Sequence, residues 1–246
     1  MVFSVLYEDN HVIAVYKPAG MLTQGDKSGD PCLMDEVKGY LKKKYKKPGN
    51  VFLGLVHRLD RPVAGIVLFA KTSKGASRLS EQFRNRTIEK TYHALVVGKP
   101  HAKTLGQSKL LYFDGRFSEP SEVSVKNRTG SRVLVNYLIK DKAKKKADIQ
   151  ENIGQRAELE YDVVASYGRC SLVKILLKTG RFHQIRAQFS FAGHPVLGDT
   201  KYGAPFALPN KSIALCATSI AFTLPTKEER KTVSIPIPSS WSAYKT

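Results

Sequence analysis

Short apolar segments rich in β-branched and aromatic residues recur along the whole chain, and they constrain the fold more than any other feature. They outnumber the segments with helical periodicity, and the two kinds do not alternate regularly as they would in a βαβ fold. No repeat of fixed period is present. The pattern predicts a single α+β domain over residues 1–246, with a mostly antiparallel mixed β-sheet and flanking helices.

The first two expected strands form a β-hairpin that turns at Asp9-Asn10 and ends at Pro18 and Gly20. Two more flank the polar segment HRLDR, which occupies residues 57–61 inside an apolar stretch. Further strands are expected at residues 88–98, 157–166, 170–178, 212–224 and 231–237.

Three helices are expected between these strands. In the first, Asp30 is the N-cap, Pro31 takes the first helical position, and apolar residues recur at helical spacing over residues 33–41. The second helix covers residues 73–86. The third covers residues 181–192, and the glycine that follows is expected to end it.

A formal charge of +19, from 40 Lys and Arg against 21 Asp and Glu, favours a polyanionic partner, because each neutralised phosphate releases condensed counterions. Nucleic acid is therefore the first candidate. A membrane surface is the competing polyanion, but we find neither an apolar run long enough to span a bilayer nor a signal peptide. No separate RNA-binding module is apparent, so structured RNA is expected to bind this domain itself.

Two lysine-rich runs, at residues 42–47 and 140–146, are as consistent with solvated charge as with phosphate contacts. The second run lies within residues 101–155, which are polar and rich in glycine, serine and lysine. We expect that segment to be irregular.

The three cysteines, Cys32, Cys170 and Cys216, are odd in number and widely spaced, without a CxxC pair. This spacing predicts neither a disulfide framework nor a zinc site. We expect small buried thiols in a reducing compartment, which points to the cytoplasm.

The segment HRLDR places His57, Arg58, Asp60 and Arg61 within five residues, between strands that bring the group to the edge of a core. A carboxylate in such a place is a candidate for catalysis. The alternative is an aspartate in a tight turn, held by two arginines as a surface ion pair. Local spacing alone favours that alternative.

The segment GRFHQIR contains Arg181, His183 and Arg186, and the last two are near neighbours on one face of a helix. An adjacent apolar stripe anchors this helix and leaves the cations toward its edge. From spacing alone, a plain amphipathic basic helix is as good an interpretation as an active-site element.

Tyr92 lies in an expected strand and alternates with two apolar residues toward one face. Most tyrosines in this position pack in a core. The alternative is a ring that serves as a stacking platform for a base.

Four segments together resemble the RluA family of pseudouridine synthases, in order and over nearly the whole chain. They are NHVIAVYKPAG, LVHRLDRPVAGIVLFAKT, EKTYHALVVG and LLKTGRFHQIRAQFSFAGHPVLGDTKYG. The resemblance implies an enzyme that isomerises a chosen uridine in structured RNA, either ribosomal or transfer RNA. Two departures stand out: Val63-Ala64-Gly65 where the family usually has Thr-Ser-Gly, and Leu215-Cys216-Ala217 where it usually has Leu-His-Ala.

The resemblance also implies roles for individual residues. Asp60 matches the catalytic aspartate, Tyr92 the tyrosine that stacks on the target base, and Arg186 the arginine that pairs with the aspartate. Arg58 matches the arginine that takes the place of the extruded base. Further contacts to the RNA are expected from His57, Arg61, Arg181 and His183.

The implied reaction fits these residue types. Uridine and pseudouridine have the same atoms, so neither a cofactor nor a metal ion is expected. An ionised carboxylate is needed either to add covalently or to help remove a sugar proton, and a guanidinium beside Asp60 would favour its charged form. The nucleotide must swing out of its stack, and the phenol of Tyr92 is a candidate for taking the C5 proton at the end.

Two other functions remain open at this point. A non-catalytic RNA-binding or ribosome-assembly protein with the same fold would not need the set of Asp60, Tyr92 and Arg186. A nucleoside hydrolase or glycosylase that uses the same carboxylate would release uracil from RNA.

Overall fold

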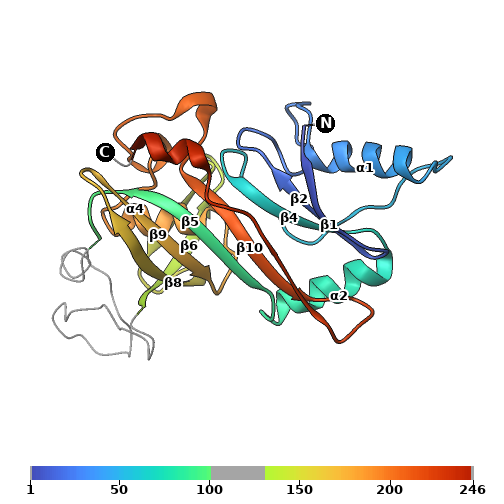
Figure 1. Ribbon diagram of the computed structural model, residues 1–246. Coiled ribbons are helices and arrows are strands. Elements are labelled where there is room, and N and C mark those ends of the chain that lie inside the picture. The colour runs from blue at the N-terminus through green and yellow to red at the C-terminus, as the bar shows by residue number, and fades with distance from the viewer. Residues whose placement is uncertain (1, 101–130, 245–246) are drawn as a thin grey trace. The chain divides into compact units, whose positions relative to one another are not determined.

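The computed structural model describes residues 2–100 and 131–244, and Figure 1 shows the helices and strands. The chain divides into two compact units. The first holds the chain as far as Lys90 together with residues 210–212 and 216–236, and the second holds the remaining described residues. In both units helices accompany largely antiparallel strands, which confirms the predicted α+β class with a mostly antiparallel mixed sheet.

In the first unit, β4 (Ala64–Ala70) is buried along its whole length and lies between two other strands. It pairs antiparallel with β2 (Val12–Lys17) and parallel with β10 (Leu215–Thr223). The outer partners, all antiparallel, are β1 (Ser4–Glu8) on β2, β11 (Arg230–Ser234) on β10, and the short β3 (Gly54–Leu55) on β4.

Two helices lie on opposite sides of the β1-β2-β4 strands in Figure 1: α1 (Leu33–Lys44) and α2 (Ser73–Arg84). Leu79 of α2 packs on one face of this sheet against alternate residues of β2 and β4, such as Val12 and Leu68. Successive side chains of a strand point to opposite faces of the sheet. Because both faces of β4 are covered, all of its side chains are apolar and its sequence is a continuous apolar run.

Two predictions for this unit are confirmed. The β1–β2 hairpin forms, and the Asp9 carboxylate accepts the backbone N–H groups of His11 and Val12 at 2.7 Å each, which fixes the turn. Two antiparallel strands, β3 and β4, flank the HRLDR segment.

The predicted start of the first helix is wrong. Its N-cap is Cys32, without a capping hydrogen bond from a side chain, and not Asp30. Cys32 makes a parallel bridge with Leu22, and Leu33 donates its N–H to the Leu22 carbonyl oxygen at 2.8 Å. This pairing keeps the chain extended through Pro31, so Asp30 is left outside the helix and pairs instead with Arg61 at 2.7 Å.

The second unit contains five antiparallel strands in the order β5-β9-β8-β6-β7. They are β5 (Glu89–Val97), β9 (Cys170–Leu177), β8 (Gln155–Ser166), β6 (Arg132–Asp141) and β7 (Lys146–Gln150). Helix α4 (Gln184–Phe191) packs on this sheet through Ala187, which joins Leu138 and Ala147 in one apolar cluster. Short 3-10 helices lie at Thr200–Tyr202 (η1), Pro209–Lys211 (η2) and Ser239–Tyr244 (η3).

The prediction that residues 101–155 are irregular is wrong over residues 132–150, where β6 and β7 form a hairpin. Residues 101–130 of that segment lie outside the described residues. The third helix is shorter than expected: it begins at Gln184, since His183 has a left-handed backbone with φ 52°, and it ends before Gly193, whose φ is 80°.

No helix among residues 2–100 and 131–244 is long and apolar enough to cross a membrane. The three cysteines are buried and unpaired, as predicted.

Candidate active site

The expected site residues fall into two groups. His57, Arg58, Asp60 and Arg61 lie in the loop between β3 and β4 of the first unit. Tyr92, Arg181, His183 and Arg186 lie in the second unit, on β5 and around the start of α4.

The backbone on both sides of Asp60 is held by residues 17–23, the segment that follows β2. The Thr23 hydroxyl donates to the Leu59 carbonyl oxygen at 2.8 Å and accepts the Leu59 N–H at 3.2 Å. Gly20 donates its N–H to the Arg61 carbonyl oxygen at 2.8 Å, and Arg61 Nε donates back to the Gly20 carbonyl oxygen at 2.9 Å. Asp60 is therefore fixed between two hydrogen-bonded neighbours while its own side chain stays partly exposed.

The buried side chain of Lys17 also contacts the backbone of this loop. Its side chain is completely buried, and Nζ donates to the carbonyl oxygens of Pro18, Met21 and Arg61 at 3.0, 2.8 and 3.2 Å. Three acceptors match the three N–H donors of an ammonium. Burial lowers the pKa of Lys17 to about 7, and the Asp60 carboxylate acts in the opposite direction by favouring the charged form.

We expect Lys17→Met to lower the free energy of unfolding by about 3 kcal/mol, because the carbonyl oxygens of Pro18 and Met21 lose the ammonium donor and that of Arg61 keeps only the Gly20 N–H. The melting temperature should fall by roughly 5–10 °C. Thermal unfolding measures the effect, and Lys74→Met, the same change at an exposed position of α2, is the control. Equal melting temperatures for the two variants would contradict the role of Lys17.

His57 is held by β4. Its Nε2 accepts the backbone N–H of Leu68 at 2.9 Å, and its ring stacks on Phe83 of α2 with 5.0 Å between centroids. Burial, followed by the nearby Lys90 ammonium, lowers the pKa of His57 to about 3. His57 is therefore neutral near pH 7 and anchors the start of the motif, whereas Arg58 is exposed.

The two departures from the family pattern are neighbours in the structure. Ala64 of β4 pairs with Cys216 of β10, and Gly65 pairs with Ala217. A Cβ added at Gly65 would lie 2.4 Å from the Ala217 carbonyl oxygen, and its φ is 128°, so only glycine fits there. The loss of hydroxyls from one strand and of a histidine from the other thus affects a single place beside the Asp60 loop.

Tyr92 alternates with Ala94 and Val96 as predicted, and all three are buried. In the β5–β9 ladder its Cα is paired with Ile175. The exposed fraction of Tyr92 is 8%, so the residue is almost entirely covered by its neighbours.

Helical spacing placed Arg186 toward the edge of the apolar stripe, and the structure buries it instead. Its exposed fraction is only 5%, and it forms a two-point ion pair with Asp199, which follows Gly198. Arg186 Nε donates to Asp199 Oδ2 at 2.6 Å, and Nη2 donates to Oδ1 at 2.9 Å. The paired fork holds the guanidinium plane in one orientation.

Tyr202 supports this pair from η1. The Arg186 guanidinium carbon lies 4.9 Å from the centre of its ring, and its hydroxyl accepts the Ala147 N–H at 2.7 Å. The same hydroxyl lies 2.9 Å from His183 Nδ1. Burial, then the charges of Arg186, Lys201 and Lys140, lowers the pKa of His183 to about 3, so the ring is neutral near pH 7 and its tautomer determines whether Nδ1 donates or accepts this hydrogen bond.

The turn before α4 is fixed by Gln184. Its Oε1 accepts the Arg181 N–H at 3.0 Å and the Thr179 hydroxyl at 2.8 Å, while Nε2 donates to the Glu158 carbonyl oxygen at 3.1 Å. Arg181 Nε donates to the Arg156 carbonyl oxygen at 3.1 Å. These contacts hold the GRFHQIR segment against the start of β8.

Local spacing missed three residues that support the two groups: Lys17, Asp199 and Tyr202. All three belong to the segments that carry the family resemblance, KPAG and GHPVLGDTKYG, and that is the signal that could have found them. Chemically, the first unit presents a carboxylate on a fixed backbone, and the second presents a guanidinium whose charge is balanced by a buried aspartate.

A family model described as RNA pseudouridylate synthase matches residues 11–191. The chain belongs to the RNA pseudouridylate synthase family. The match confirms the resemblance stated from the sequence, and it makes the protein an RNA pseudouridine synthase, an isomerase.

Two curated relatives illustrate the similarity. The chain is 30% identical to the tRNA pseudouridine synthase C of Pasteurella multocida, over 98% of this chain and 94% of that protein. It is 27% identical to the ribosomal large subunit pseudouridine synthase C of Vibrio cholerae, over 95% of this chain but only 65% of that protein. Among solved structures, human RNA pseudouridylate synthase domain containing 4 matches with a TM-score of 0.70 at 22% identity, over 97% and 90% of the two chains, which shows the same fold.

Proposed function

We propose that this synthase converts a specific uridine of structured ribosomal or transfer RNA to pseudouridine, with Asp60 as the catalytic carboxylate. The observation that carries the proposal is the fixed backbone around Asp60, where Leu59 and Arg61 are both hydrogen-bonded to residues 17–23. The names of the two relatives, one acting on tRNA and one on the large ribosomal subunit, support these substrate classes.

In this proposal Asp60 attacks the sugar or base or helps remove a sugar proton, and Arg186 favours its ionised form. Tyr92 stacks on the extruded uracil, and Arg58, which is exposed, fills the gap in the RNA stack. Arg61, Arg181 and His183 add contacts to the RNA. The support for these roles is the motif resemblance together with the fixed geometry of each group of residues.

The geometry of His57 favours a different role from the RNA contact expected for it. Because its Nε2 accepts the Leu68 N–H, we propose that His57 positions the loop. We further propose that the whole chain acts as one catalytic domain, without a cofactor or metal ion, in the cytoplasm. The three buried, unpaired cysteines support a reducing compartment.

Pseudouridine mapping across total RNA tests the proposed function. We expect one or a few pseudouridines to disappear in a strain that lacks the gene and to return when the gene is restored. Purified protein should restore them in RNA from that strain even with a strong chelator present, provided the RNA stays folded. Unchanged modification would favour a non-catalytic RNA-binding protein, and released uracil would identify a glycosylase.

A further inference from the structure

The two lysine-rich runs have different surroundings. In the run at residues 42–47, Lys44 donates to Glu8 at 2.7 Å and its ammonium lies over the rings of Tyr40 and Tyr45. Glu8 also accepts a bond from Lys71 at 2.7 Å. The positive charges of the lysines in the last turn of α1 interact favourably with the negative end of the helix dipole. This run therefore stabilises the end of α1.

The run at residues 140–146 forms the turn of the β6–β7 hairpin and contains five lysines and one aspartate. Asp141 shapes the turn, since it accepts the Lys144 N–H at 2.9 Å and pairs with the Lys144 ammonium at 3.5 Å. Lys142 and Lys145 are exposed. The turn therefore carries a dense positive charge with little local neutralisation.

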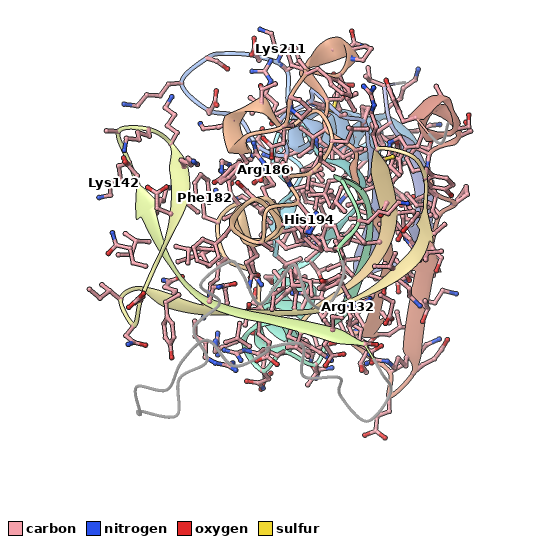
Figure 2. The ribbon with its side chains drawn as sticks, turned by 90° about the vertical axis from the view of Figure 1, so that its left-hand side faces the viewer. Arg132, Lys142, Phe182, Arg186, His194 and Lys211 are labelled. Carbon is pink, nitrogen blue, oxygen red and sulfur yellow. The ribbon has the colours of Figure 1, made fainter. Side chains whose placement is uncertain are left out.

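The base of this hairpin is anchored beside the segment that positions Arg186. Lys140 lies over the ring of Phe182 at 4.6 Å, and Lys146 lies over the ring of Tyr202 at 5.0 Å. Figure 2 shows Phe182 between the hairpin that carries Lys142 and the helix that carries Arg186. The lysines at the ends of the run are used to dock the hairpin, and those at its tip are left to reach outward.

We infer that the tip of the β6–β7 hairpin, residues 142–145, binds the phosphate backbone of the RNA that flanks the target uridine. The run on α1 does not. The inference rests on the proposed function, because it assigns the RNA substrate a further contact next to the segment that positions Arg186. Lysine ammoniums at a docked turn bind phosphates as point charges, and each neutralised phosphate adds counterion release.

Two double variants test the inference. Lys142/Lys145→Gln removes two exposed charges from the hairpin, and Lys43/Lys46→Gln removes two from the end of α1. The pairs are matched in backbone, since Lys145 and Lys46 both have left-handed conformations, with φ 48° and 47°. The substrate is bulk RNA purified from a strain that lacks the gene, and single-turnover pseudouridine formation is followed over a range of protein and salt concentrations.

We expect the hairpin variant to raise the protein concentration for half-maximal rate on the order of tenfold at moderate salt, and to reduce the salt slope by roughly 1.5–2. The maximal rate should stay unchanged, and the α1 variant should match the wild type in all three quantities. Equal behaviour of the two variants would overturn the inference. An unaltered RNA titration for the hairpin variant, together with loss of binding to an acidic protein, would overturn it as well. No turnover by the wild type would instead count against the proposed function.

Discussion

Replacing Asp60 with asparagine is expected to abolish pseudouridine formation while RNA binding survives. The amide has nearly the same shape as the carboxylate, but it can neither attack the sugar nor accept a proton as a carboxylate does. We expect the single-turnover rate to fall by a factor of about 10⁴ or more. The bonds that fix the loop use backbone atoms of Leu59 and Arg61, so they persist in the variant.

The matched control for Asp60→Asn is Asp30→Asn, which makes the same change at a partly exposed carboxylate that pairs with Arg61. Exposed pairs of this kind contribute about 0–1 kcal/mol, so its rate should stay within a few-fold of the wild type. Affinity for RNA and melting temperature are measured on the same samples. Near-normal turnover by Asp60→Asn would refute both the mechanism and the placement of the site.

Local sequence patterns predicted the elements whose structure is decided locally. The β1–β2 hairpin follows from an apolar run, the turn at Asp9 and a second apolar run, and the same logic located the strands around HRLDR. The β6–β7 hairpin was missed because its buried positions include Asn136, and its turn is a lysine run that resembles a solvated loop. Pairing with β8 supplies the burial that the composition concealed.

The partners of the site residues could not be predicted from spacing, because they are distant in the sequence. Leu59 is bonded to Thr23, and Arg61 is bonded to Lys17, across about forty residues. Helical periodicity placed Arg186 toward the edge of the apolar stripe, but it is buried against a carboxylate 13 residues later in the sequence. A buried charge needs a partner of opposite charge. When that partner lies more than one helical turn away in the sequence, local spacing does not reveal it.

Asp199→Asn is expected to slow single-turnover pseudouridine formation by roughly 100-fold with little change in RNA affinity. The carboxylate holds the Arg186 guanidinium at two points, and the amide can accept only one of these bonds while losing the charge. A misplacement of about 1 Å in a catalytic group can cost a factor of this size. Asp199→Glu keeps the charge and should recover part of the rate.

Stability measurements separate this positioning role from simple loss of folding. Asp199→Asn removes the buried carboxylate charge that pairs with the Arg186 guanidinium and should lower the free energy of unfolding by roughly 3–5 kcal/mol. The double variant Arg186→Gln/Asp199→Asn removes both charges, so it should regain much of that stability but none of the turnover. Rates are compared well below the melting temperature of each variant, where all are folded. A fully folded Asp199→Asn protein with the wild-type rate would show that Arg186 does not depend on Asp199, and recovery of turnover by the double variant would show that Arg186 is not needed for the reaction.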